Sequence, residues 1–136
     1  IANNGIKNEL NIVDSIISED DREIEKIKKY KARRIISEHT ALLIKNMMKE
    51  VISSGTGVMV QKYSGNSAAG KTGTAQTGWG IGKERKVHAW FAGYFPADNP
   101  VYAAAVFLED GRSGQDVAAP VFGMLVEKIL KLGKRY

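Results

Sequence analysis

The sequence contains no cysteine, which excludes thiolate metal sites, a cysteine nucleophile and disulfide bonds. Long hydrophobic runs are missing as well, because no uninterrupted apolar stretch approaches the roughly 18 residues of a membrane-spanning helix. We therefore expect no membrane span here and place any anchor outside these 136 residues. An initiator methionine is also lacking, since the chain opens on Ile1, so we expect it to be part of a longer protein.

A nucleic-acid-binding motif is likewise absent. The chain has 20 basic and 15 acidic residues, a net charge of +5, and its basic residues gather at 22–34, 83–86 and 128–135. In the first of these stretches acids such as Glu23 and Glu25 alternate with the cations, and no aromatic ladder accompanies them. We interpret all three stretches as solvated faces and expect no nucleic-acid partner.

The first half of the chain predicts a strand, an ambiguous segment and an amphipathic helix. Residues 10–17 are rich in β-branched side chains and precede a turn, which favours a strand. Residues 22–36 fit either a helix or the returning strand of a hairpin. Ser37 is a candidate N-cap of a helix that ends before Gly55. Its apolar stripe, which we expect to face the core, consists of Ala41, Ile44, Met47, Met48, Val51 and Ile52.

Beyond Gly57 the pattern favours extended structure interrupted by glycine. Residues 58–63 predict a short strand, and residues 68–76 predict an extended segment because Thr72 and Thr74 prefer strands. Three alternate glycines then make a loop that carries Trp79, for which packing is the expected role.

Two strong strand patterns and a helix complete the chain. Residues 87–95 and 101–108 are joined by a connection too short for a parallel crossover, so they form an antiparallel hairpin. The second of these strands is apolar throughout, which predicts burial on both faces. A helix that starts near residue 116 or 118 has Pro120 in its first turn. We therefore predict an α+β fold in which helices flank an antiparallel sheet.

Histidine offers no metal site. His39 falls in the first turn of the predicted helix with no second ligand nearby, and His88 opens a strand. Both fit surface positions. We expect neither a metal nor a cofactor.

The glycine-rich stretch at 65–76 satisfies two incompatible motifs. From Gly65 to Thr72 it matches G-x-x-x-x-G-K-[ST], a loop that cradles phosphates. From Lys71 to Gly73 it gives the Lys-Thr-Gly element of serine acyl-transferases that react with penicillin. A phosphate loop requires a helix that begins at its Lys-Thr, whereas Gly73 and an antiparallel hairpin follow here. The acids that end the strand at 106–110 are weak support for nucleotide binding, so we favour the second motif.

An extended chain at Lys71 gathers the groups that acyl transfer needs. Thr72 and Thr74 point to the same face of a strand and offer two hydroxyls to a substrate carboxylate. Gly73 lacks a side chain, so an extended substrate can lie against the backbone. Lys71 adds a cation that attracts the carboxylate and eases removal of a proton from a serine hydroxyl. A backbone N–H of this strand can stabilise the tetrahedral oxyanion.

Several stretches together resemble one known family. They are AGKTGTAQ at 69–76, AWFAGYFPADNP at 89–100 and AAPVF at 118–122, with IANNG at 1–5 and GTG at 55–57 in matching places. They resemble the C-terminal half of the transpeptidase domain of penicillin-binding proteins, most closely the class B, monofunctional type. The resemblance implies part of a penicillin-binding protein/serine β-lactamase-like fold. It also implies a D,D-transpeptidase that cross-links peptidoglycan stem peptides and is acylated by β-lactams.

The resemblance also assigns roles to residues. It implies that Lys71 belongs to the third active-site motif, that Thr72 and Thr74 bind the carboxylate of substrate or antibiotic, and that the Thr74 N–H forms half of the oxyanion hole. The family's Ser-x-x-Lys is absent from the sequence. We therefore expect residues 1–136 to be a C-terminal fragment that lacks the nucleophile-bearing first half and is inactive alone. Ser64-Gly65-Asn66 spells the family's Ser-x-Asn, but it lies too close to Lys71 on the same segment, so we interpret it as a coincidence.

Besides the less favoured phosphate-loop nucleotide-binding protein, two alternatives remain open. A β-lactamase or β-lactam sensor domain of the same fold shares Lys-Thr-Gly. Alternatively, the fragment serves only as a binding module whose exposed cut face drives dimerisation. The expected partners are stem peptides, β-lactams, the remaining half of the transpeptidase domain and a second copy of the fragment. The expected location is the extracytoplasmic face of the bacterial cell membrane.

Overall fold

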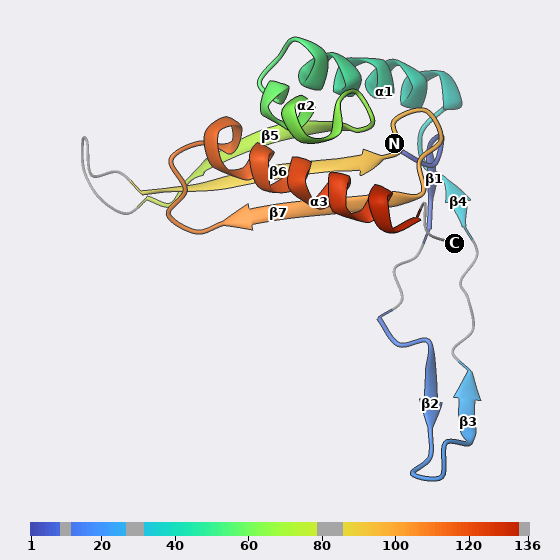
Figure 1. The fold of residues 1–136 in the computed structure, drawn as a ribbon. Coiled ribbons are helices and arrows are strands. Elements are labelled where there is room, and N and C mark those ends of the chain that lie inside the picture. Colours follow the sequence, from blue (N-terminus) through green and yellow to red (C-terminus); the bar gives the residue numbers. More distant parts are fainter. Residues whose placement is uncertain (9–11, 27–31, 79–85, 134–136) are drawn as a thin grey trace.

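The structure is a computed structural model that describes residues 1–8, 12–26, 32–78 and 86–133 (Figure 1). Its described elements are two small strand pairs, a central sheet and a set of helices that pack around that sheet. Trp79 and the loop around it lie outside the described residues.

Two small antiparallel pairs precede the central sheet. Strand β1 (Ile6–Lys7) pairs with β4 (Arg33–Arg34), and between them in sequence β2 (Ser15–Ile17) pairs with β3 (Glu23–Lys26). The β2–β3 hairpin projects away from the rest of the molecule (Figure 1). Of the two interpretations of residues 22–36, the returning strand is therefore the correct one, although residues 27–31 lie outside the described part.

Helix α1 (Glu38–Ser53) begins at the predicted cap. The Ser37 hydroxyl accepts a hydrogen bond from the Thr40 N–H at 3.0 Å, which satisfies one of the free donors of the first turn. The helix ends before Gly55, as the sequence predicts.

The buried side of α1 differs in part from the predicted stripe. Ala41 and Ile52 are fully buried, but Met47 is 65% exposed, so its predicted packing role is wrong. Lys45 is buried instead, and its ammonium donates to Asn4 Oδ1 at 2.6 Å. The reason is that the N-terminal residues cover the Lys45 side of the helix, whereas no described element covers Met47.

Helix α2 (Val58–Ser64) replaces the short strand predicted at 58–63, so that prediction is wrong. Its β-branched residues favour a strand, but tertiary packing decides. Val60 is fully buried, and a Cβ atom added at Gly123 would lie 3.0 Å from the Val60 Cα and carbonyl oxygen. This close approach of two backbones fits a helix that packs against another helix.

The central sheet is antiparallel and has the order β5-β6-β7. Strand β5 (Ala69–Gln76) pairs with β6 (Val87–Phe95), which pairs with β7 (Tyr102–Leu108). A π-helical turn, η2 (Gly114–Ala118), leads from the sheet into α3 (Ala119–Gly133), which has Pro120 in its first turn. The predicted extended segment at 68–76, the hairpin and the last helix are all confirmed.

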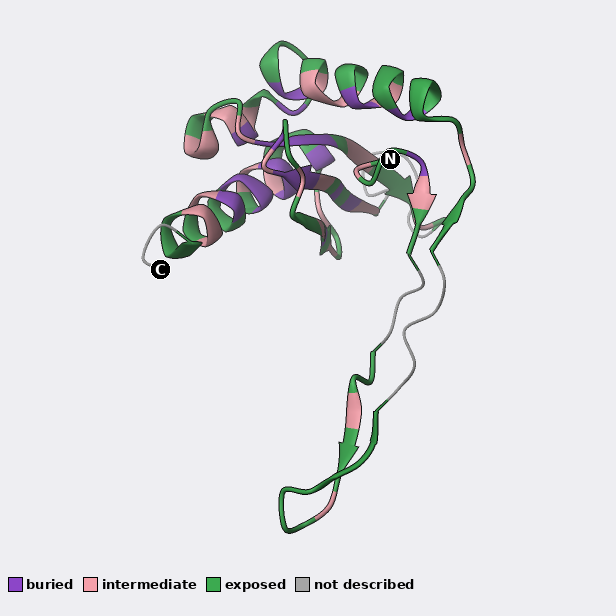
Figure 2. Ribbon diagram, turned by 90° about the vertical axis from the view of Figure 1, so that its right-hand side faces the viewer, coloured by how far each residue is buried: buried purple, intermediate pink, exposed green. Residues whose placement is uncertain are grey.

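The core lies between the sheet and the helices (Figure 2). Phe91 and Phe95 point from β6 toward Phe122 of α3, and all three side chains are fully buried. The rings of Phe91 and Phe122 have centroids 4.6 Å apart. The predicted α+β class, an antiparallel sheet flanked by helices, is confirmed.

Only one face of the sheet is well covered by described residues. In β7 only Val106 is buried, whereas Tyr102 is 47% and Phe107 46% exposed. The prediction that this strand is buried on both faces is therefore wrong. Apolar residues on the second face, Phe107 and Trp90 among them, are left in contact with solvent.

Candidate active site

The Lys-Thr-Gly segment lies in the middle of β5, at the edge of the sheet. Its register with β6 pairs Lys71 with Ala92 and Gly73 with Trp90. On its other side β5 has no strand partner within the described residues. No helix begins at Lys71, and the sheet around it is antiparallel. The phosphate-loop interpretation is therefore wrong, because that loop needs the N-terminus of a helix.

Lys71 and Thr72 contact each other around this edge. The Lys71 ammonium donates to the Thr72 hydroxyl and to the Thr72 carbonyl oxygen, both at 3.1 Å. Thr72 stands opposite the buried Phe91, so its side chain belongs to the face that the helices cover. Neighbouring residues in a strand face opposite ways, so Lys71 starts from the other face. Its ammonium reaches around the strand and brings a positive charge beside the hydroxyl.

The peptide groups of β5 alternate between β6 and the free edge. Gly73 faces β6, because a Cβ atom added at Gly114 would lie near the Gly73 nitrogen, the Gly73 oxygen and the Trp90 oxygen together. The Thr72 carbonyl, which accepts from Lys71, then faces the free edge. The same alternation directs the N–H of Thr74 to that edge. Gly73 has no side chain, so the strand edge is uncovered at this position. A Cβ atom there would also make a tight contact of 3.2 Å with the Trp90 Cβ.

Thr74 is held by the turn η2, which is distant in sequence but adjacent in space. The backbone N–H of Gly114 donates to the Thr74 hydroxyl oxygen at 3.2 Å. Gly114 approaches the sheet so closely that a Cβ there would lie 2.6 Å from the carbonyl oxygens of Gly73 and Trp90. The turn η2 therefore packs on the face of the sheet that the helices cover and fixes the Thr74 hydroxyl there.

Two residues of this cluster escaped the sequence-based reasoning. Gly114 comes shortly before the predicted last helix, and nothing in the sequence indicated a role for it. Thr56 was noticed as part of Gly55-Thr56-Gly57, but without a role. In the structure its hydroxyl lies 2.7 Å from the Thr72 hydroxyl. The signal available in sequence was the pair of glycines around it, which marks a tight turn next to the helix end.

The Ser64-Gly65-Asn66 match belongs to a different part of the structure. Ser64 donates to the carbonyl of Val60 within α2, and Asn66 Oδ1 accepts from the Gln61 side chain. Both side chains therefore bond to α2 rather than to Lys71.

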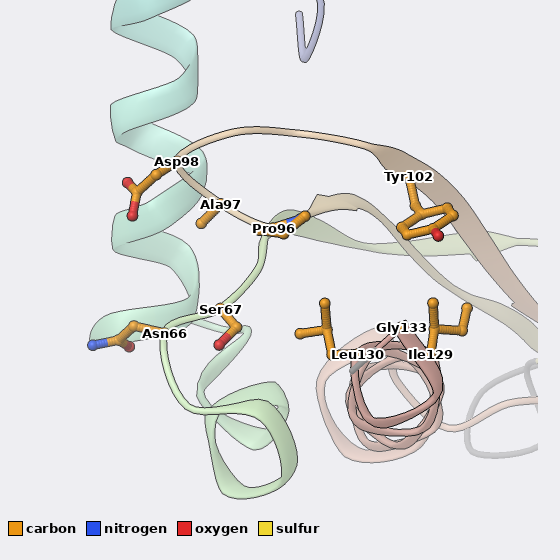
Figure 3. A pocket seen from close by; sticks show the side chains of 9 residues that line it. All are labelled: Asn66, Ser67, Pro96, Ala97, Asp98, Tyr102, Ile129, Leu130 and Gly133. Atoms are coloured by element: carbon orange, nitrogen blue, oxygen red, sulfur yellow. The ribbon is translucent and has the colours of Figure 1, made fainter. Parts of the chain in front are cut away.

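A pocket of about 480 Å³ lies beside Asn66, at the end of the sheet where β5 starts. Ile129 and Leu130 of α3 point toward Pro96 and Tyr102 across it (Figure 3). Neither Lys71 nor the threonines of β5 line this pocket. Lys71, Thr72 and Thr74 therefore lie on a strand edge outside this pocket.

The other titratable groups of the described residues do not form a second candidate site. In the described part of the chain no group of histidine, aspartate and glutamate side chains is arranged to hold a metal ion. His39 is exposed, as expected, whereas His88 is half-buried against Phe107, with ring centroids 5.0 Å apart. A hydrogen bond from Lys86 to Asp110, at 2.6 Å, raises the pKa of the lysine. None of the helices in the described ranges is long and apolar enough to cross a membrane.

Comparison with known proteins identifies the family. Residues 1–127 match the penicillin binding protein transpeptidase domain. The chain is 26% identical over 132 residues to the peptidoglycan D,D-transpeptidase FtsI of Buchnera aphidicola, covering 93% of this chain and 20% of FtsI. It is 30% identical over 140 residues to the peptidoglycan D,D-transpeptidase PbpA of Mycolicibacterium smegmatis, covering 98% of this chain and 28% of PbpA.

A solved structure agrees with these sequence matches. The imipenem acyl-enzyme complex of penicillin-binding protein A from M. tuberculosis superposes with a TM-score of 0.73 at 30% identity. The superposition covers 95% of this chain and 28% of that one. Both kinds of match point to the same class of protein, the transpeptidases of peptidoglycan synthesis. The chain belongs to the penicillin-binding protein transpeptidase domain family, and it spans less than a third of the length of each of these three proteins.

Proposed function

We propose that the chain forms the Lys-Thr-Gly side of the active site of a class B peptidoglycan D,D-transpeptidase. The complete enzyme cross-links stem peptides by serine acyl transfer and is acylated by β-lactams. A serine oxygen attacks a peptide carbonyl, the departing amine takes up the proton, and the acyl group then passes to an amine of a second stem peptide. No cofactor is needed for these steps.

The arrangement of Lys71, Thr72 and Thr74 on the free edge of β5 carries this proposal. The two hydroxyls lie on one face of the strand and are donors for a substrate carboxylate. The Lys71 ammonium beside Thr72 adds the positive charge that this carboxylate requires. The edge N–H of Thr74 is a donor for the oxyanion that forms when the serine attacks. An extended peptide can lie along the bare edge at Gly73.

The serine must come from outside the 136 residues, because they contain no Ser-x-x-Lys. That FtsI and PbpA are several times longer supports this division. We propose that residues 1–136 are the C-terminal part of the transpeptidase domain and that the nucleophile-bearing part packs on the second face of the sheet. Trp90 and Phe107 are 40% and 46% exposed there, with ring centroids 4.4 Å apart. Without that part, the same face is free to bind a second copy of the chain.

We place the complete protein on the extracytoplasmic face of the bacterial cell membrane. The support is that its relatives are named as enzymes of peptidoglycan, which is assembled there. The membrane anchor then belongs to residues outside this chain.

A fluorescent penicillin tests the proposal. The 136-residue chain is expected to form no covalent adduct, whereas the product of the complete reading frame is expected to form one that survives denaturation. Lys71→Ala in the complete protein is expected to lower the rate of adduct formation, while Lys62→Ala on α2 leaves it unchanged. An adduct on the isolated chain contradicts the missing nucleophile, and an adduct that hydrolyses within seconds indicates a β-lactamase. No adduct on the complete protein contradicts the proposal.

A further inference from the structure

The turn between α1 and α2 is held tightly in place. The N–H of Gly57 donates to the Val51 carbonyl at 2.8 Å, and the N–H of Gly55 donates to the Glu50 carbonyl at 3.1 Å. A Cβ atom added at Gly55 would lie 2.9 Å from the Val51 Cα, so the turn packs directly onto the end of α1. Thr56, between the two glycines, therefore has a fixed backbone position.

The side chain of Thr56 is directed at Thr72. The two hydroxyl oxygens lie 2.7 Å apart, and either one is able to donate. A hydroxyl has one proton to donate and two lone pairs that accept. The Thr72 oxygen already accepts from the Lys71 ammonium at 3.1 Å. If Thr56 donates as well, both lone pairs of Thr72 are occupied and its own proton is left for a ligand.

The Thr74 hydroxyl also accepts a hydrogen bond from the protein. Its hydroxyl oxygen accepts from the Gly114 N–H, at 3.2 Å, so its proton is also available. Two neighbouring hydroxyls that accept from the protein and donate outward suit a carboxylate, which only accepts. A hydrogen bond donated by Thr56 to the Thr72 hydroxyl would correspond to the one that the Gly114 N–H donates to the Thr74 hydroxyl.

We infer that Thr56 is a positioning residue, which donates its proton to Thr72 and so holds the Thr72 hydroxyl as a donor to the substrate carboxylate. This inference rests on the proposed function, because it takes Thr72 as a carboxylate ligand. Thr56 itself touches neither the substrate nor the reacting atoms. Its effect is confined to ligands that carry the carboxylate.

The test uses the complete protein with three substitutions. Thr56→Val keeps the shape and removes the hydroxyl, and Thr56→Ser keeps the hydroxyl. Ser54→Ala removes a hydroxyl from the same connection, one that donates to the Glu50 carbonyl. The second-order rate of acylation is measured with benzylpenicillin and with its methyl ester, which lacks the negative charge. Melting temperatures are measured for all variants.

In Thr56→Val the Thr72 hydroxyl is no longer held as a donor, so its hydrogen bond to the charged ligand is weakened and acylation by benzylpenicillin is expected to slow about tenfold. The rate with the methyl ester is expected to stay within about twofold of the wild type, and Thr56→Ser and Ser54→Ala should match the wild type with both compounds. An unchanged rate with benzylpenicillin in Thr56→Val overturns the inference. Equal slowing with acid and ester does so too, because it indicates a merely structural role. A wild-type protein that is not acylated, or that reacts equally with acid and ester, contradicts the proposed function instead.

Discussion

At the scale of single residues, burial of Tyr94 in the fold changes the protonation of its side chain. It is 2% exposed and packs with Ala69, Ala97 and Met48. Within the described residues its hydroxyl has no hydrogen-bond partner. Burial, assisted by the negative charge of Asp98, raises the pKa of Tyr94 to about 12.

This raised pKa predicts a loss of stability in alkali. A tyrosine titrates near pH 10 in the unfolded chain. Its folded-state pKa is higher, so its contribution is complete below pH 10 and is lost as the pH rises toward 12. Two units correspond to about 2–3 kcal/mol of unfolding free energy. Tyr94→Phe is expected to remove this part of the alkaline loss and to change stability little at neutral pH.

The measurement is urea unfolding of the wild type and the variant between pH 8 and pH 12, at intervals of about one unit. The difference between the two curves isolates Tyr94, because lysines titrate in both proteins. Tyr102→Phe is the control, since Tyr102 is 47% exposed. Parallel curves for the wild type and Tyr94→Phe would contradict the expected role of burial.

At the scale of elements, the contact between η2 and β5 depends on one missing methyl group. A Cβ atom at Gly114 would press on the carbonyl oxygens of Gly73 and Trp90 and push the N–H of Gly114 away from Thr74. Gly114→Ala is therefore expected to lower the unfolding free energy by about 1–3 kcal/mol, the usual effect of overpacking. The midpoint of urea unfolding measures this loss. Gly133→Ala is the control, because within 4 Å a Cβ there meets no described atom outside the neighbouring turn of its own helix. An equal effect of both changes would exclude the proposed contact.

Elements with a local signal were predictable from the sequence. The cap at Ser37 is a local hydrogen bond, and the β6–β7 hairpin follows from a short connection. The extended conformation of β5 followed from Thr72 and Thr74, which favour strands, and from Gly73, which disfavours a helix. These features need no knowledge of distant parts of the chain.

Elements decided by distant contacts were not predictable. Helix α2 has the composition of a strand, and its helical conformation is explained by its close packing against α3 at Gly123, a contact that the local sequence does not indicate. Met47 fits the apolar stripe of α1, but no described element covers it. Likewise Lys71, Thr72 and Gly73 were recognisable from their order, whereas Thr56 and Gly114 join them only through folding.

At the scale of the whole molecule, the sheet divides the chain into two unequal sides. One face is closed by α2, η2 and α3 around Phe91 and Phe122. The other face carries the exposed Trp90 and Phe107, next to the Lys71 edge. An exposed apolar patch of this kind marks an interaction surface. The patch and the free edge are adjacent, so a partner that covers the patch also reaches Lys71.

The isolated chain is therefore expected to associate with itself through this face. Replacing Trp90 and Phe107 together by serine removes the apolar side chains from a surface position, so it should weaken association at little loss of stability. Sedimentation velocity over about a hundredfold range of concentration measures the weight-average mass. Ile24→Ser is the matched control, because Ile24 is 67% exposed on the projecting β2–β3 hairpin. If Ile24→Ser weakens association and the double variant does not, the hairpin and not the sheet face joins the copies.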